Sequence, residues 1–301
     1  MKWNRCFRLF FAIFFLAGNI FERSAFAVEE SQPIVVVATI VPLEEFVQEI
    51  GDGLVKTQVM IPPGANLHVY EPTPRQLQTV SAAQLYVALG SGLEFENLWL
   101  ERLQSLNRSM AVCRSGEKVE LIESENGAIS GNHENHFHGR KDPHIWLSPK
   151  NALIIVKAIR DTLVQLDPGH AADYFQRWQN LDRELRKLDQ ELTKRFSGLK
   201  QREFLVYHPA WQYFAHAYGL REVAIEAEGK EPTATRIAGV IRRAREAGIR
   251  VIFASPQFNQ KSAQVVAEEL NGQVVLIDEL ARPYVQNLRS AADKIFEAGQ
   301  P

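Results

Sequence analysis

The sequence holds little cysteine and no long apolar run beyond its first segment. Its only cysteines are Cys6 and Cys113, and Cys6 lies in an N-terminal segment that we expect to be removed. One remaining cysteine cannot form an intrachain disulfide, so the exported chain must fold on its hydrophobic core alone. No run after Ile20 is long and apolar enough to predict a membrane-spanning helix.

The chain also lacks an excess of positive charge. It carries 34 Lys and Arg residues against 36 Asp and Glu residues, a formal net charge of −2. Removal of residues 1–27 would take away more basic than acidic residues and leave the charge more negative still. A nucleic-acid-binding protein needs a basic surface, so nucleic acid is excluded as an expected partner.

Residues 1–27 have the pattern of a cleaved export signal. Lys2, Arg5 and Arg8 precede the apolar run from Leu9 to Ile20, and Ala25-Phe26-Ala27 forms a small-x-small cleavage site. An apolar run of about a dozen residues is shorter than the roughly 20 that a spanning helix needs, which disfavours an uncleaved anchor. No cysteine follows the run to carry a lipid. We therefore expect a periplasmic protein.

Short β-branched runs alternate with amphipathic segments in both halves of the chain. The expected strands are Ile34 to Ala38, Val55 to Ile61, Leu85 to Leu89, Phe204 to Tyr207, Val223 to Ile225, Val251 to Ala254 and Val274 to Ile277. The expected helices include Leu43 to Ile50, Thr73 to Ala83, Trp211 to Tyr218, Thr233 to Ala247 and Lys261 to Leu270. This alternation predicts an α/β fold with parallel sheets, divided into lobes at residues 28–166 and 200–301.

Residues 167–199 between the lobes have a different pattern. Their apolar side chains recur in steps of three and four, which predicts one long amphipathic helix opened by Asp167-Pro168 and ended near Gly198. At 1.5 Å per residue it would be roughly 50 Å long. A coiled-coil dimer seam is the alternative, but the pattern lasts little over four heptads. We expect a helical strut within a monomer, which would allow only modest motion between the lobes.

Four metal-capable side chains fall in loops where such a fold binds ligands. In open parallel sheets, ligands bind beyond the carboxyl ends of the strands. His208 and Asp278 each directly follow an expected strand, whereas His68 lies in a turn-rich loop and His144 in an extended stretch before a helix. Two of these residues therefore come from each half of the chain.

Three imidazoles and one carboxylate would suit a tetrahedral zinc ion. A site filled by four protein ligands favours holding the metal over catalysis, which needs an open position for water. Other interpretations stay open at this point. The four residues could be unrelated surface groups, or the chain could be a zinc hydrolase with Glu71 or Asp142 as general base, or an adhesin or structural protein without a tight metal.

Five segments carry a recognisable pattern: LHVYEPTPRQLQTVSAAQLYVALGSGLE, DPHIWLSPKNALIIVKAIRDTL, VYHPAWQYFAHAYGL, EGKEPTATRIAGVIRRA and IFASPQFN. In order and spacing they resemble the metal-binding solute-binding proteins of bacterial ABC transporters, and most of all their zinc branch. The resemblance implies two Rossmann-like lobes joined by a long helix. It also implies that the protein is not an enzyme and that its partner is an ATP-driven permease in the inner membrane.

The same resemblance assigns His68, His144, His208 and Asp278 as the ligands of the transported metal. Manganese-type relatives tend to have a carboxylate at the third position, so His208 favours Zn(II), with Mn(II) or Fe(II) as the alternative.

The chain departs from the family pattern at two strand ends. Ser255 stands where relatives often have glutamate, and Glu279 follows Asp278 where proline is common. Glu71 and Glu228 are therefore reserve oxygen ligands.

A histidine-rich segment precedes His144. Residues 131–139 are polar and turn-rich, which predicts a surface loop, and they contain His133, Glu134, His136 and His138. The loop could form an accessory metal site, or it could be a solvated loop whose histidines bind nothing.

Overall fold

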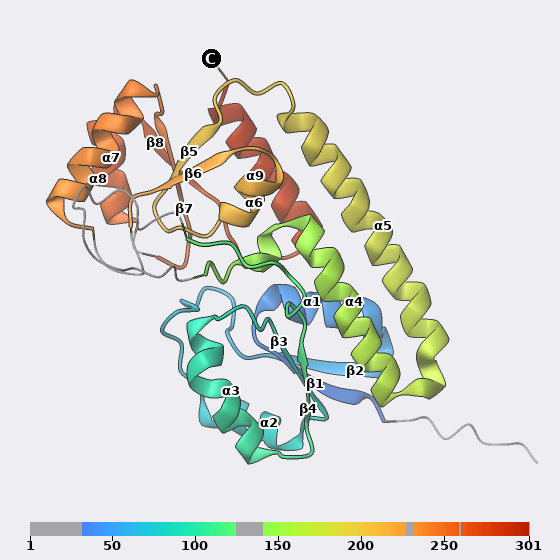
Figure 1. The fold of residues 1–301 in the computed structure, drawn as a ribbon. Coiled ribbons are helices and arrows are strands. Elements are labelled where there is room, and N and C mark those ends of the chain that lie inside the picture. Colours follow the sequence, from blue (N-terminus) through green and yellow to red (C-terminus); the bar gives the residue numbers. More distant parts are fainter. Residues whose placement is uncertain (1–31, 125–140, 227–231, 259, 301) are drawn as a thin grey trace, which may run out of the picture. The chain divides into compact units, whose positions relative to one another are not determined.

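Two parallel sheets form the framework of the protein. The computed structural model describes residues 32–124, 141–226, 232–258 and 260–300. Residues 33–301 make one compact unit that contains two four-stranded sheets, each in its own lobe (Figure 1). All pairings between the named strands are parallel. Parallel neighbours need crossover connections, so helices lie between the strands in the chain.

The N-terminal sheet has the strand order β2-β1-β3-β4. The elements of this lobe are β1 (Ile34–Ala38), α1 (Val41–Gly51), the 3₁₀ helix η1 (Asp52–Leu54), β2 (Val55–Val59), α2 (Pro74–Ala82), β3 (Leu85–Ala88), α3 (Glu94–Leu106) and β4 (Ala111–Arg114).

The C-terminal sheet repeats this arrangement with the order β6-β5-β7-β8. Its lobe contains β5 (Glu203–Val206), α6 (Gln212–Ala217), β6 (Arg221–Ala224), α7 (Ala234–Glu246), β7 (Val251–Ala254), α8 (Lys261–Glu269), β8 (Gln273–Leu276) and α9 (Tyr284–Ala298). In both sheets the first strand in sequence pairs with the two that follow it.

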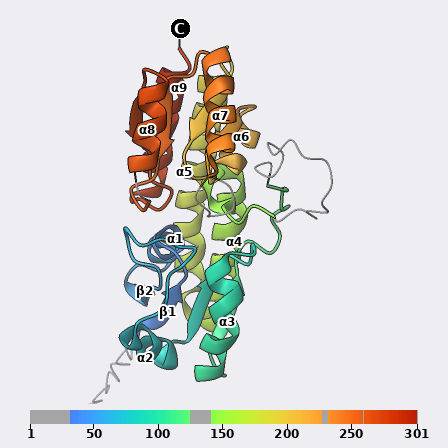
Figure 2. The same ribbon diagram turned by 90° about the vertical axis from the view of Figure 1, so that its left-hand side faces the viewer.

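A pair of long helices connects the lobes. After the 3₁₀ helix η3 (Ile145–Leu147) come α4 (Pro149–Leu166), the 3₁₀ helix η4 (Pro168–His170) and α5 (Ala171–Phe196). Figures 1 and 2 show α5 passing from the level of the N-terminal sheet to the C-terminal lobe. The predicted strut is therefore present, although it begins at Ala171 rather than Asp167. The Asp167 side chain instead accepts a hydrogen bond from the Tyr174 hydroxyl and pairs with His170, which holds a tight turn there.

Most of the apolar stripe of α5 is buried within the chain, although Phe175 near its start is 47% exposed. Its buried side chains are Tyr174, Leu181, Leu185, Leu188, Leu192 and Phe196. They belong to one apolar cluster that also includes residues of α1, α4 and α9. From Leu181 to Phe196 the stripe is therefore covered within the chain, which supports the strut interpretation over the coiled coil.

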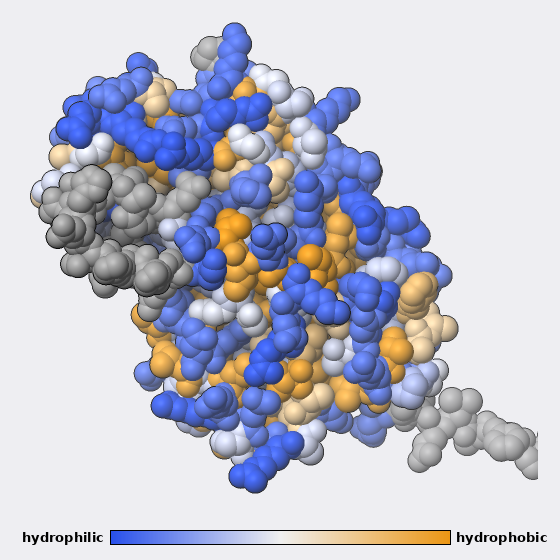
Figure 3. Space-filling view, in the orientation of Figure 1, coloured by the Kyte–Doolittle hydropathy of each residue, from blue (hydrophilic) through white to orange (hydrophobic). Residues whose placement is uncertain are grey.

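The C-terminal sheet is covered on both faces. Phe204 and Val206 of β5 belong to the large cluster that includes α9, whereas Leu205 and Tyr207 belong to a second cluster with α7 and α8. Alternate residues of a strand point to opposite faces, so this division matches a sheet between two helical layers. On the face drawn in Figure 3, hydrophilic and hydrophobic side chains are interspersed. None of the described helices is both long and apolar enough to span a bilayer.

The predicted fold class is confirmed: the chain is α/β, with two parallel-sheet lobes and a long connecting helix. The strand β4 (Ala111–Arg114) was not predicted, because it is a short strand at the edge of its sheet with a single β-branched residue. The proposed lobe boundaries at residues 166 and 200 stay predictions. The predicted export signal and the histidine-rich loop lie outside the described residues.

Candidate metal centre

His68 lies in the loop between β2 and α2, and side-chain hydrogen bonds fasten this loop. Thr73 caps α2: its hydroxyl accepts from the Gln76 backbone N–H, while Gln76 Oε1 accepts from the Thr73 N–H at 2.9 Å. The amide of Gln76 also donates to the Met60 carbonyl just after β2. Asn66 Oδ1 accepts from the His68 N–H at 2.9 Å. Local turn chemistry therefore fixes the backbone that carries the imidazole.

His144 is held by its own loop. Asp142 Oδ1 accepts from the His144 backbone N–H at 2.8 Å and lies 2.7 Å from the ring Nδ1. The Ser91 hydroxyl, from the loop after β3, donates to the Pro143 carbonyl at 2.7 Å. His144 is buried, and its Nε2 has no hydrogen-bond partner among the described residues. This orphaned nitrogen is the atom that a metal would use.

His208 follows β5 at the carboxyl edge of the C-terminal sheet. Its Nδ1 lies 3.3 Å from Oε2 of Glu226, which comes just after the neighbouring strand β6. Burial, opposed by the hydrogen bond to Glu226 and reinforced by the nearby His144 and His68, lowers the pKa of His208 to about 4. The imidazole is therefore neutral at neutral pH, the form that binds metal.

The three histidines converge on one point between the lobes. Nε2 of His68 lies 3.0 Å from Nε2 of His208, and the ring of His144 lies 5.5 Å and 5.6 Å from the rings of those two residues. One ligand atom from each of the three lies within 4.8 Å of the others. A tetrahedral ion with bonds of about 2.05 Å would hold its nitrogens about 3.4 Å apart. The observed spacing therefore fits a single small ion.

Carboxylates decide which ring nitrogens face this point. Glu94 Oε2 lies 2.9 Å from Nδ1 of His68. Burial raises the pKa of Glu94, but the hydrogen bond and the charge of His68 outweigh it and lower the pKa to about 2. An ionised carboxylate can only accept, so Nδ1 carries a hydrogen, and in the neutral imidazole, the form that binds metal, Nε2 offers a lone pair. With the same arrangement at His144 and His208, all three neutral imidazoles can present Nε2 to one cation.

The structure brings together His68, His144 and His208 but does not place Asp278 in this group. Asp278 Oδ1 accepts from Gln257 Nε2 at 2.6 Å and from the Leu280 N–H at 2.8 Å. Its role as fourth ligand stays a prediction. Of the reserve ligands, Glu71 is exposed and Glu228 lies outside the described residues.

Glu279, the residue that departs from the family pattern, is buried at 1% exposure. Its Oε1 accepts from the Ser255 hydroxyl at 2.9 Å, and its Oε2 has no hydrogen-bond partner within the described part of the chain. Burial raises the pKa of Glu279 to about 7, with a smaller opposing effect from Ser255.

The three carboxylates that orient the histidines were not predicted in that role. Asp142, the candidate hydrolytic base, has its Oδ1 engaged by His144. Glu226 could have been found because it follows a strand end, the criterion that identified His208. Glu94 carries no such signal, because only the packing of α3 brings it to His68.

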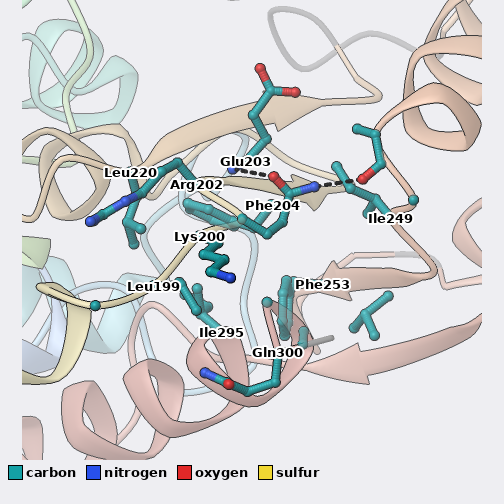
Figure 4. A pocket seen from close by; sticks show the side chains of 17 residues that line it. Leu199, Lys200, Arg202, Glu203, Phe204, Leu220, Ile249, Phe253, Ile295 and Gln300 are labelled. Carbon is teal, nitrogen blue, oxygen red and sulfur yellow. Dashed lines mark hydrogen bonds between the residues drawn. The ribbon is translucent and has the colours of Figure 1, made fainter.

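A separate cavity of about 400 Å³ lies at the opposite, amino edge of the C-terminal sheet (Figure 4). Lys200 extends among Leu199, Phe204, Phe253 and Ile295. Residues at the ends of α5, α7 and α9 also line it. Its lining contains no histidine, so this cavity is not a candidate for the metal centre.

The fold and the three-histidine site define a class: a two-lobed metal-binding protein of the solute-binding type. The chain belongs to the family described as zinc-uptake complex component A, periplasmic, which matches residues 36–298. Members are transport components rather than enzymes, which excludes the zinc hydrolase. The chain is thus a metal-binding component of an ABC uptake system.

Relatives of known structure and sequence differ in the metal that they are named for. A crystal structure of ZnuA is 35% identical, covers 89% of this chain and 100% of its own, and superimposes with a TM-score of 0.82. The iron-binding protein YfeA of Yersinia pestis is 30% identical over 82% of this chain and 78% of its own length. The zinc-binding protein AdcA of Streptococcus pyogenes is 24% identical over 88% of this chain, which spans about half (52%) of AdcA.

Proposed function

We propose that this protein captures Zn(II) in the periplasm and delivers it to an inner-membrane permease. One observation carries the proposal: the Nε2 atoms of His68, His144 and His208 face one point, while each Nδ1 is engaged by a carboxylate. Neutral nitrogen ligands in this number favour zinc over manganese, which prefers oxygen. Asp278 is proposed as the fourth ligand, because it lies just past β8 at the same edge of the sheet.

Fe(II) or Mn(II) is the second candidate cargo. A relative at 30% identity is named an iron-binding protein, and a carboxylate from Asp278 would add the oxygen that such metals accept.

Metal competition separates these candidates. Residues 28–301 would be purified, stripped of metal and titrated with Zn(II), Mn(II) and Fe(II) against chelators of known affinity. We expect one tight equivalent of zinc, weakened at least a hundred-fold in His208→Ala. His216→Ala, an exposed histidine of α6 in the same lobe, is the control and should bind like the unmodified chain. A preference for manganese or iron, or no tight metal at all, would contradict the proposal.

We further propose that His133, Glu134, His136 and His138 form a weak accessory site. Three imidazoles and a carboxylate within six residues can chelate, although ordering the loop costs conformational entropy. Deleting residues 133–138 should leave the tight equivalent intact and remove only weaker ones in the same titration. Loss of the tight equivalent would show that the loop and the central site are not separate.

We also propose that residues 1–27 act as a signal peptide that directs export and is cut after Ala27. Mass spectrometry of the protein recovered from the periplasm should find Val28 at its N-terminus.

A further inference from the structure

Phe258 lies against the metal centre without being one of its ligands. Its ring stacks on the imidazole of His208, with centroids 4.2 Å apart and planes 22° apart. The same ring lies 6.4 Å from that of His68, so it touches the C-terminal lobe's histidine and approaches one from the other lobe. Phe258 is half-buried, whereas His208 beneath it is only 6% exposed. The phenyl ring therefore covers one face of a ligand.

The loop that carries Phe258 is fastened to the neighbouring strand end. The Phe258 N–H donates to the Ser255 carbonyl at 3.3 Å, which closes a turn just after β7. Gln257 Nε2 donates to Asp278 Oδ1, and the Ser255 hydroxyl donates to Glu279 Oε1. Two side-chain contacts thus fix the position of the turn, and with it the phenyl ring.

We propose that Phe258 is a shielding and positioning residue of the metal site, and that it slows metal exchange. The proposal rests on the proposed metal-binding function. A bound cation draws electron density from the imidazole, which strengthens its contact with an aromatic face. The ring also blocks water from one side of His208, and an incoming water is what displaces a ligand or expands a four-coordinate zinc site.

The first test measures zinc release. Zinc-loaded protein would be mixed with an excess of a chromogenic chelator, and the dissociation rate of Phe258→Ala compared with that of the unmodified chain. We expect an increase of about ten-fold, because aromatic stacking of this kind corresponds to about three- to ten-fold in an equilibrium and water access adds to it. Phe258→Leu keeps most of the volume but not the aromatic face, and should fall between the two.

A matched control separates shielding from a general loss of packing. Phe296 of α9 lies in the same lobe, is also half-buried and packs against Phe196. Within the described residues its ring does not stack on any of the three histidines. Phe296→Ala should leave the zinc release rate unchanged. Equal release rates for Phe258→Ala and Phe296→Ala would overturn the proposal.

Two further measurements distinguish failure of the shielding proposal from failure of the proposed zinc-binding function. In Co(II)-loaded protein, Phe258→Ala should weaken the visible absorption as water raises the coordination number, whereas Phe296→Ala should not. In metal-free protein, diethyl pyrocarbonate should modify His208 faster in Phe258→Ala, as read by peptide mass spectrometry. This last result needs no metal, so it tests the shield even if the unmodified chain binds no zinc. An unchanged rate of modification would refute shielding by itself.

Discussion

The two lobes contribute to the metal centre in different ways. The N-terminal part of the chain supplies His68 and His144, whose Nδ1 atoms lie 2.9 Å and 2.7 Å from their carboxylates. The C-terminal lobe supplies His208, whose Nδ1 lies 3.3 Å from its carboxylate, and the proposed fourth ligand Asp278 accepts a hydrogen bond from Gln257 of the same lobe. The carboxylate contacts are therefore shorter on the N-terminal side of the site than at His208.

A preorganised ligand loses little entropy on binding, so we expect the more closely held His68 and His144 to contribute more to metal affinity than His208. Substitutions on the N-terminal side of the site should therefore lower metal affinity by a larger factor than matching substitutions around His208.

The largest expected effect is on the acid stability of the metal-free protein. The pKa of His208 is about 4 when folded, against an ordinary value of 6.5. Below pH 6.5 this histidine is protonated in the unfolded chain but stays neutral in the folded chain, so the free energy of unfolding falls as pH drops from 6.5 to 4. A shift of this size corresponds to about 3 kcal/mol. Urea unfolding of His208→Asn across this range should show a flatter pH dependence than the unmodified chain.

The control for this prediction is His216→Asn, at an exposed position of the same lobe. It should keep the full pH dependence. If both variants lost stability with acid in the same way, burial of His208 would not be the cause.

The next effect concerns the carboxylates behind the histidines. Asp142→Asn keeps an acceptor oxygen but removes the charge that fixes the His144 tautomer, and zinc affinity should fall about 10- to 100-fold. Glu226→Gln should lower zinc affinity by a smaller factor, because the contact of Glu226 with His208 is longer. Chelator competition measures both. The control is Asp293→Asn, which removes an ion pair with Arg195 and should leave zinc affinity unchanged. A larger loss of affinity in Glu226→Gln than in Asp142→Asn would contradict the greater contribution expected of the N-terminal ligands.

How far the sequence predicts this site depends on where each residue lies. His208 and Asp278 follow strands, so hydrophobic patterning and the general behaviour of parallel sheets locate them without a structure. The lobes and the strut follow from the same patterning. Glu94 could not be found in this way, because nothing near it in sequence signals that the first turn of α3 reaches His68.

The orientation of the aromatic ring that covers His208 likewise cannot be predicted from the sequence. Phe258 is one of 17 phenylalanines, and only the turn fixed by Gln257 and Ser255 sets it on His208. The same holds for Asp278: its position at a strand end is predictable, but the hydrogen bond that occupies Oδ1 is a property of the packed loops.

The smallest expected effect is the change in zinc affinity caused by Asp278→Asn, which tests the C-terminal side of the site alone. Asp278→Asn retains an Oδ1 that can accept from Gln257 and Leu280, so the loop should keep its shape while the negative charge is lost. If Asp278 completes the shell on the C-terminal side, zinc affinity should fall about ten-fold, less than for loss of a histidine, because water can take the fourth position. Thermal unfolding of the metal-free variant should match the unmodified chain, which would assign the loss to the metal. Unchanged affinity would mean that the C-terminal half holds zinc through His208 alone, and that the fourth position belongs to water or to another oxygen.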